Sequence, residues 1–186
     1  MAPFSSLLRP FLRRAQTAQQ PSLLGHPFRL LLRTVKYFCF AHLFWEYGYS
    51  IGPAEGPSML PTFEVSNEWI LISKLYRHGR GVQVGDLVNY KIPIEPHAEG
   101  IKRVVGLPGD YVLIDSPDSG SDAMIQVPPG HCWLVGDNLP ASRDSRAFGP
   151  VPLALVRGKV LAKTWPFYEF QWMRNPLKEY SSVSDS

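Results

Sequence analysis

After about residue 53 the chain consists of short apolar runs separated by glycine, proline and aspartate. Six of these runs are rich in β-branched and aromatic residues and have the length of strands: 69–75, 86–92, 101–107, 111–115, 132–136 and 156–165. The segments between them contain the Gly-Asp and Pro-Gly pairs that are typical of turns. No long stretch here has a helical period. The pattern therefore predicts a mainly β domain over residues 53–170 and a C-terminal tail over 171–186.

The N-terminal part of the chain has a different pattern. Residues 1–33 are rich in Arg, Leu, Ser and Gln and contain no acidic residue, which is typical of a mitochondrial targeting segment. A disordered basic tail is the alternative. Residues 34–52 are aromatic and apolar but include Lys36, His42 and Glu46, so they are marginal for a spanning helix of about 20 apolar residues. We expect a single membrane-anchor helix here; the alternative is an amphipathic helix lying on a membrane or packed on the domain.

The net positive charge of the chain is concentrated at its N-terminus. The formal net charge is +3, yet the first 36 residues carry six basic and no acidic residues, so the rest of the chain is net negative. A nucleic-acid-binding domain keeps its positive charge in the folded body, so we expect no nucleic-acid partner. Basic residues before the anchor favour an N-terminus on the positive-inside face and a domain on the other side. The two cysteines, Cys39 and Cys132, show neither a disulfide framework nor a metal-site pattern.

Two residues of the domain have the setting that nucleophilic catalysis requires. Ser58 lies in GPSMLPT, where prolines restrict the backbone and Gly56 permits close approach of another chain. A serine hydroxyl needs a base to take its proton. Lys102 begins an apolar strand whose side chains would desolvate its ammonium and favour the neutral amine. Taken singly, Ser58 fits an ordinary turn serine and Lys102 an ordinary surface lysine.

Other potential bases and neighbours are less well placed. The domain's histidines, His78, His97 and His131, lie in loop-like segments, where a solvated or structural role is favoured. Arg103 follows Lys102 on the same predicted strand, so its side chain should point to the opposite face. Ser-Lys dyads are a recognised alternative to histidine-based triads, which leaves Lys102 as the candidate base.

Four segments are dense in residues that ordinary strands avoid: GPSMLPT (56–62), GDLVNY (85–90), KRVVGLPGD (102–110) and GDNLPASRDSRAFGP (136–150). In this order they resemble the type I signal peptidase family of Ser-Lys serine endopeptidases, and the resemblance extends over residues 40–166. It implies a signal-peptidase-like β domain with an N-terminal membrane-anchor helix. It also implies that Ser58 is the nucleophile, that Lys102 is the general base, and that the backbone N–H of Ser58 holds the oxyanion.

The resemblance extends to three supporting residues. It implies that the Ser142 hydroxyl contacts the lysine amine and that Asp144 and Arg146 form an ion pair that braces the site. Many bacterial members add a hydroxyl two residues before the nucleophile, where this chain has Gly56. Losing such a donor costs about 10²–10³ in rate where a site depends on it. Either backbone donors and water replace it, or the oxyanion hole is built differently.

Within the family, the chain resembles the mitochondrial inner-membrane branch. The basic head, the short anchor containing AH-x-x-x-EY and the segment that follows GDNLPASRDSR carry this likeness. The endoplasmic-reticulum branch has His in place of Lys102. The likeness implies precursors with bipartite presequences, cleaved on the intermembrane-space side of the mitochondrial inner membrane. It also implies contact with membrane lipid, a heterodimer with a related second protease subunit, and no cofactor or metal.

Three other readings remain open at this stage. A non-catalytic membrane-anchored scaffold could keep the fold, although intact Ser58, Lys102 and Ser142 argue against it. A self-cleaving repressor-type Ser-Lys protease would need a DNA-binding helix pair, where residues 1–52 contain an apolar segment instead. A bacterial-type leader peptidase shares the chemistry and differs in compartment.

Overall fold

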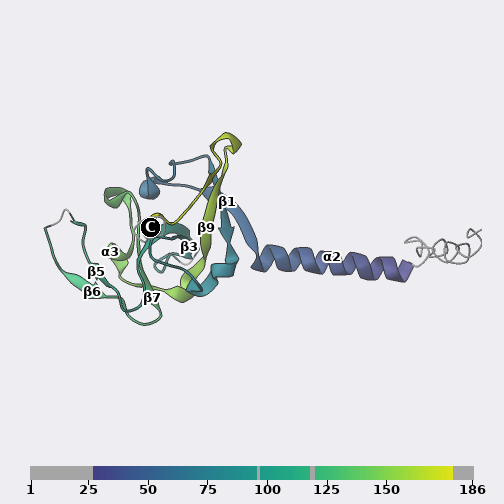
Figure 1. The fold of residues 1–186 in the computed structure, drawn as a ribbon, viewed down its shortest axis with the longest axis horizontal. Coiled ribbons are helices and arrows are strands. Elements are labelled where there is room, and N and C mark those ends of the chain that lie inside the picture. Colours follow the sequence, from purple (N-terminus) through teal and green to yellow (C-terminus); the bar gives the residue numbers. More distant parts are fainter. Residues whose placement is uncertain (1–26, 96, 118–119, 178–186) are drawn as a thin grey trace, which may run out of the picture. The chain divides into compact units, whose positions relative to one another are not determined.

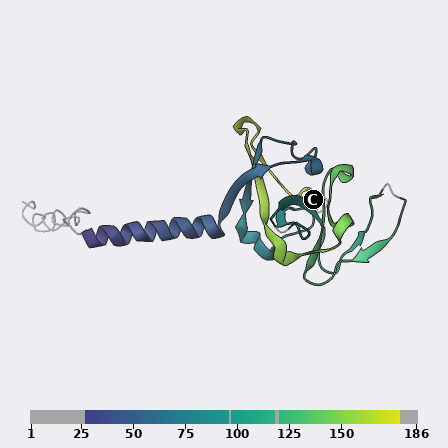
Figure 2. The same ribbon diagram turned by 180° about the vertical axis from the view of Figure 1, so that it is seen from behind.

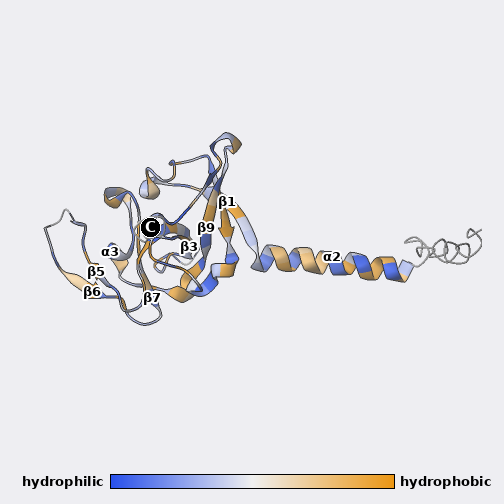
Figure 3. Cartoon of the chain, viewed as in Figure 1, coloured by the Kyte–Doolittle hydropathy of each residue, from blue (hydrophilic) through white to orange (hydrophobic). Residues whose placement is uncertain are grey.

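A computed structural model describes residues 27–95, 97–117 and 120–177, and the chain divides into two compact units, 1–42 and 43–186. Most of the predicted targeting segment and part of the predicted tail therefore lie outside the described residues. Helix α2 (Pro27–Tyr47) has no buried residue, and Figure 3 shows both apolar and polar residues along its length. Among the described helices, none combines the length and apolarity needed to cross a membrane. The helix starts before the expected anchor and ends earlier, because residues from Tyr49 onward pair as a strand.

The domain is built on one eight-stranded antiparallel sheet (Figure 1). Its strands are β1 (Tyr49–Ala54), β2 (Glu68–Ser73), β3 (Leu87–Lys91), β4 (Glu99–Gly106), β7 (His131–Val135), β8 (Val151–Pro152), β9 (Val156–Trp165) and β10 (Gln171–Trp172). They are ordered β1-β2-β9-β3-β4-β7-β8, and β10 pairs with β9. A separate hairpin, β5 (Tyr111–Leu113) and β6 (Met124–Gln126), lies at the far end of the domain from β1, as Figure 2 also shows.

The mainly β prediction is confirmed, and each of the six predicted strands overlaps an observed one. The structure adds β1, β6, β8 and β10. The only α-helix beyond α2 in the described part of the chain is the single turn α3 (Ser145–Phe148). β10 and the buried side chain of Asn175 fall within the segment expected to be a tail, so the described part of that segment packs on the domain.

Two clusters of buried side chains form most of the core. The first contains Val82, Val88, Tyr90, Val104, Cys132, Leu134, Val151 and Val156. The second contains Ala54, Met59, Phe63, Ile70, Ile72, Leu87 and Val160. Met59 and Phe63 come from the loop after β1, and burying each is worth roughly 1.5–3 kcal/mol. The second cluster therefore fixes the loop that carries Ser58.

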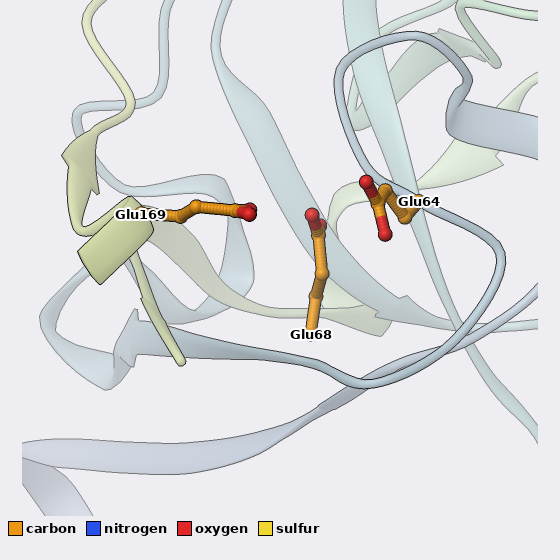
Figure 4. A group of neighbouring side chains, drawn as sticks. All are labelled: Glu64, Glu68 and Glu169. Atoms are coloured by element: carbon orange, nitrogen blue, oxygen red, sulfur yellow. The ribbon is translucent and has the colours of Figure 1, made fainter. Parts of the chain in front are cut away.

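Two of three clustered glutamates next to this core form ion pairs with one lysine. The side chains of Glu64, Glu68 and Glu169 converge in Figure 4. Lys163 of β9 forms ion pairs with the almost fully buried Glu68 and, at 2.9 Å, with Glu169. Burial alone would lower the pKa of Lys163, but the two carboxylates outweigh burial and raise it. Lys163 thus ties β2 to the turn between β9 and β10.

Candidate active site

Ser58 lies on a single-turn 3₁₀ helix, Pro57–Met59, directly after β1. Gly56, which precedes the turn, has φ 97° and ψ 158°, a region that is open essentially to glycine alone. Within the turn, Met59 is buried in the core and its carbonyl accepts a hydrogen bond from the Phe63 N–H. These constraints hold the Ser58 backbone in place.

Lys102 lies on β4 with its Nζ 2.6 Å from the Ser58 Oγ. Only 5% of the residue is exposed, and it forms no ion pair within the described part of the chain. Burial lowers its pKa from the ordinary value of 10.5, because desolvation disfavours the ammonium. The charges of Asp144 and Asp137 offset only part of this lowering. The structure therefore brings together a serine hydroxyl and a lysine amine that is biased toward its neutral form.

The segment Gly136–Asn138 holds the Ser58 turn from the other side. The backbone N–H of Asn138 donates to the Ser58 carbonyl at 3.0 Å, and its side-chain amide donates to the Pro57 carbonyl at 3.0 Å. A Cβ added to Gly136 would lie 2.5 Å from the Ser58 carbonyl oxygen. Only glycine permits this close approach.

A second set of hydrogen bonds reaches the same turn through Asp137, which the sequence analysis did not identify. Arg103 donates two hydrogen bonds to Asp137, at 2.8 and 2.7 Å, and one to the Gly85 carbonyl at 2.9 Å. The Thr62 hydroxyl donates to the same carboxylate at 2.5 Å. Burial alone would raise the pKa of Asp137, but the bonds from Arg103 and Thr62 more than offset it. Arg103 therefore braces the Ser58 turn indirectly.

Asp144 is the centre of a third network. It is 1% exposed and forms the expected ion pair with Arg146, with a Nε–Oδ1 distance of 2.9 Å. It also accepts hydrogen bonds from the Gly136 N–H at 3.0 Å and the Ser142 hydroxyl at 2.6 Å. Burial would raise the pKa of Asp144, but these bonds, the one from Arg146 foremost, lower it on balance.

The expected contact between Ser142 and Lys102 is not formed in this structure. The Ser142 hydroxyl donates to Asp144 instead, because that carboxylate is two residues away and is the stronger acceptor. The same hydroxyl lies close to where a Gly136 Cβ would be, so Ser142 remains beside the Ser58 turn.

The remaining expectations concern the oxyanion donor and the histidines. The backbone N–H of Ser58 donates to no acceptor among the described residues, which leaves it available. A Cβ at Gly56 would have no neighbour within 4 Å, so the space beside it is open. His78 and His131 contact backbone carbonyls of Ala154 and Pro129, and none of the described histidines bonds to Ser58.

Ser58 and Lys102 line a groove of about 500 Å³. It is lined by Ser50, Ile51, Gly52, Pro53, Ala54, Glu55, Gly56, Met59, Phe63, Glu64, Ile70, Ile72, Asn89, Ile92, Glu99, Gly100 and Ile101. Two strand edges flank it. β1 pairs only with β2, and β4 pairs with β7 only from Arg103 onward, so Glu99–Lys102 have one unpaired side. Such edges can bind an extended peptide by main-chain hydrogen bonds.

One family model and several known proteins resemble this chain. A family model described as signal peptidase, peptidase S26, matches residues 28–121 and 115–165. Mouse mitochondrial inner membrane protease subunit 1 is 42% identical over 153 residues, covering 82% of this chain and 92% of the mouse protein. The Schizosaccharomyces pombe protein of the same name is 39% identical over 153 residues, covering 82% and 95%. Zebrafish mitochondrial inner membrane protease subunit 2 is 36% identical over 123 residues, covering 66% and 64%.

Proposed function

This chain belongs to the signal peptidase family, peptidase S26, and we propose that it cleaves its substrates with Ser58 as nucleophile and Lys102 as general base. One observation carries the proposal: a buried lysine, without a carboxylate partner among the described residues, lies 2.6 Å from a serine hydroxyl in a groove. A neutral amine at that distance is within reach of the hydroxyl proton. Lysine in this setting supplies what histidine supplies in a triad.

The reaction follows from that geometry in two halves. Neutral Lys102 takes the Ser58 proton as Oγ attacks the scissile carbonyl, and the Ser58 backbone N–H donates to the developing oxyanion. The Lys102 ammonium then protonates the departing amine, which leaves an acyl-enzyme and a neutral lysine. Water attacks the ester, Lys102 takes its proton, and that proton returns to Ser58 as the acid product leaves. Arg103, Asp137, Asn138, Ser142, Asp144 and Arg146 act as positioning residues.

We infer that the substrates are precursors with bipartite presequences, cleaved at the intermembrane-space side of the mitochondrial inner membrane. The relatives named mitochondrial inner membrane protease support this location, and the basic N-terminal part of the chain agrees with it. An extended segment would bind along the unpaired edges of β1 and β4. The name subunit 1 on these relatives, and the similarity to a subunit 2, support a heterodimer with a related second subunit.

Membrane attachment is part of the same proposal. Exposed apolar side chains run along α2, among them Phe38, Phe40, Leu43 and Trp45. We propose that this segment anchors the domain and contacts lipid. In mitochondria with ruptured outer membranes, added protease should digest residues 60–170. Digestion only after the inner membrane is dissolved would place the domain on the matrix side.

The catalytic assignment is tested with the full chain, assembled with its partner in detergent. Ser58→Ala should leave precursor cleavage undetectable while the thermal unfolding midpoint stays near that of the wild type. Proteomics of precursor N-termini from mitochondria carrying this variant should show retained sorting segments. Normal precursor cleavage by Ser58→Ala would contradict the assignment and favour a non-catalytic scaffold.

A further inference from the structure

The turn that carries Ser58 has a second hollow on its other side. The groove described above includes Ser58, whereas Leu60 and Pro61, which follow it in the chain, line a separate hollow of about 730 Å³. Asn138 and Leu139 line the same hollow. The single-turn helices that carry Ser58 and Leu139 lie beside each other. The second hollow therefore begins where the groove ends.

The second hollow adjoins an apolar pocket of about 350 Å³ beside the β5–β6 hairpin. Leu139 lines both spaces. Ser116, which lines the hollow, lies between Asp115 and Pro117, which line the pocket. The groove, the Ser58 turn, the second hollow and the pocket thus follow one another along the domain.

The pocket has a buried floor and an exposed apolar rim. Val112 and Trp133 line it and are 5% and 3% exposed, so they form its floor. Val105, Tyr111 and Met124 also line it, but they are 43%, 68% and 61% exposed and form its rim. Single apolar side chains on a surface are ordinary, whereas several gathered around one apolar pocket indicate a binding site. The pocket is therefore suited to an apolar group that reaches it from solvent.

The hairpin that carries part of this rim packs closely against β4. A Cβ added to Gly106 would lie 2.6 Å from the Val112 side chain, so glycine at this position permits the close approach. The pairing of β4 with β7 shifts its register between Val104 and Gly106, which places Val105 at a bulge. Bulges often redirect a side chain next to a functional site. The pocket is therefore already formed in the absence of a ligand.

The polar groups beside the pocket favour an apolar ligand as well. The Asp137 carboxylate and the Arg146 guanidinium are held by the ion pairs described above, and Arg146 also donates to the Ser116 hydroxyl. Asp115, which lines the pocket, is exposed and forms no ion pair with a described residue. An acidic side chain in the pocket would lose water and lie near the Asp115 carboxylate, which is costly. The pocket therefore selects for apolar side chains and against acidic ones.

The two sides of the Ser58 turn face different halves of a substrate. The groove adjoins a cavity of about 340 Å³ that Glu46, at the end of α2, also lines. Under the proposed function, a sorting segment precedes the scissile bond and arrives from the membrane, so it occupies the groove on the α2 side. The segment after the scissile bond then passes the Ser58 turn toward the β5–β6 hairpin. An extended chain advances about 3.3 Å per residue, so three to five residues cover roughly 10–17 Å.

We propose that the pocket between the β5–β6 hairpin and β4 binds an apolar side chain about three to five residues after the scissile bond. This inference rests on the proposed function and concerns the part of the substrate that becomes the N-terminus of the mature protein. The second hollow holds the residues between the scissile bond and that side chain. Binding removes the side chain and the rim residues Val105, Tyr111 and Met124 from water, which favours the complex.

Peptides that vary only after the scissile bond test the pocket. The reference is a precursor-derived peptide with alanine at every position after the bond, and leucine or aspartate then replaces one alanine at a time. With the assembled wild-type enzyme, leucine should raise kcat/KM about 10-fold at one position about three to five residues after the bond, because its additional carbon atoms are buried. Aspartate at that position should lower kcat/KM below the alanine value. Met124→Asp makes the rim polar and should reduce the leucine preference to about 2-fold or less.

Leu75→Asp is the matched control. Leu75 is 59% exposed, close to the 61% of Met124, and lines neither the groove, the second hollow nor the pocket, so this variant should keep the wild-type preference. Both positions are exposed, so both variants should fold. A preference that Met124→Asp leaves intact, or that Leu75→Asp also removes, overturns the pocket. Cleavage of every peptide without selectivity overturns the pocket alone, whereas cleavage of none, or cleavage by Ser58→Ala, overturns the proposed function as well.

Discussion

Two lysines are buried in the same sheet with opposite surroundings. Lys102 on β4 is 5% exposed and contacts a serine hydroxyl, whereas Lys163 on β9 is 9% exposed and is flanked by Glu68 and Glu169. Burial pushes the pKa of both lysines down, because both ammonium groups lose water. The pKa of Lys102 ends below its ordinary value and that of Lys163 above it, so the carboxylates decide the outcome.

The comparison shows what favours the neutral form of a buried lysine. Burial of the ammonium alone is not sufficient to lower the pKa, because an adjacent carboxylate raises it again. The carboxylates nearest to Lys102 are instead engaged elsewhere: Asp137 binds Arg103 and Asp144 binds Arg146. They stabilise the loop that carries Ser58 without neutralising the lysine by direct contact. The position of the carboxylates therefore distinguishes the proposed base, Lys102, from Lys163.

Exchanging the two lysines for methionine should give the largest contrast. Lys102→Met should lower kcat/KM at least about 10³-fold, because it removes the base, while the protein stays folded. Lys102→Arg should do the same, since a guanidinium keeps its proton at working pH. Lys163→Met should keep its rate per folded molecule but unfold at a lower temperature. The assignment is wrong if both Lys102 variants cleave precursors at near wild-type rates.

Removing a partner of Lys163 should cost stability and not chemistry. Glu68→Gln leaves a buried ammonium with only Glu169, and breaking a buried pair lowers the free energy of unfolding by roughly 3 kcal/mol. Because the folded pKa of Lys163 is raised, this stabilisation is fully present below pH 10.5 and is lost as the pH rises through the folded value. Urea unfolding of the wild type and variant at pH 7 and pH 11 measures both effects. A variant as stable as the wild type at pH 7 would remove the structural role.

Asp137→Asn should act on Lys102 from a distance. Asp137 raises the pKa of Lys102 through its charge and also holds the Ser58 turn through Thr62. Its loss should shift the pH–rate curve to lower pH, and misplacement of the turn should lower the plateau by roughly 10-fold. Asp122→Asn, at an exposed position, should change neither. A lower plateau without a shift would mean that Asp137 only positions the turn.

Thr62→Val should have the smallest effect. It keeps the shape of the side chain but removes one hydrogen bond to Asp137. That hydrogen bond is worth about 1 kcal/mol, so we expect about a fivefold loss of rate. The pH–rate curve should keep its midpoint, because the Asp137 charge remains. Steady-state kinetics at several pH values separate a change in rate from a change in midpoint.

The sequence predicts the strands well because their signals are local. Runs such as 132–136 carry their own β-branched and aromatic composition, and β7 forms there. β1 escapes prediction because residues 49–52 continue the aromatic run of α2, and their strand character depends on pairing with β2. For the same reason helix α2 ends at Tyr47 and does not continue to residue 52, where we expected the helix to end.

Some features of the candidate site can likewise be predicted from local motifs, and others cannot. Ser58, Lys102 and the Asp144–Arg146 pair can be placed from motifs, since each lies within one short segment. The Arg103–Asp137 and Thr62–Asp137 bonds join residues 34 and 75 positions apart, which no local pattern reveals. The expected Ser142–Lys102 contact is not formed in this structure, because the Ser142 hydroxyl donates to the nearer Asp144 carboxylate. Hydrogen bonds between residues far apart in the sequence therefore cannot be predicted from local motifs.

The pH dependence of kcat/KM for precursor cleavage tests the central claim most directly. If Lys102 must be neutral to accept the Ser58 proton, the rate should rise tenfold per pH unit and level off at an ionisation below 10.5. That ionisation should persist when His78, His97 and His131 are each replaced by Gln, and should shift in Asp137→Asn. A curve that is flat from pH 6 to 10, or one whose ionisation disappears with a histidine, would contradict Lys102 as the base.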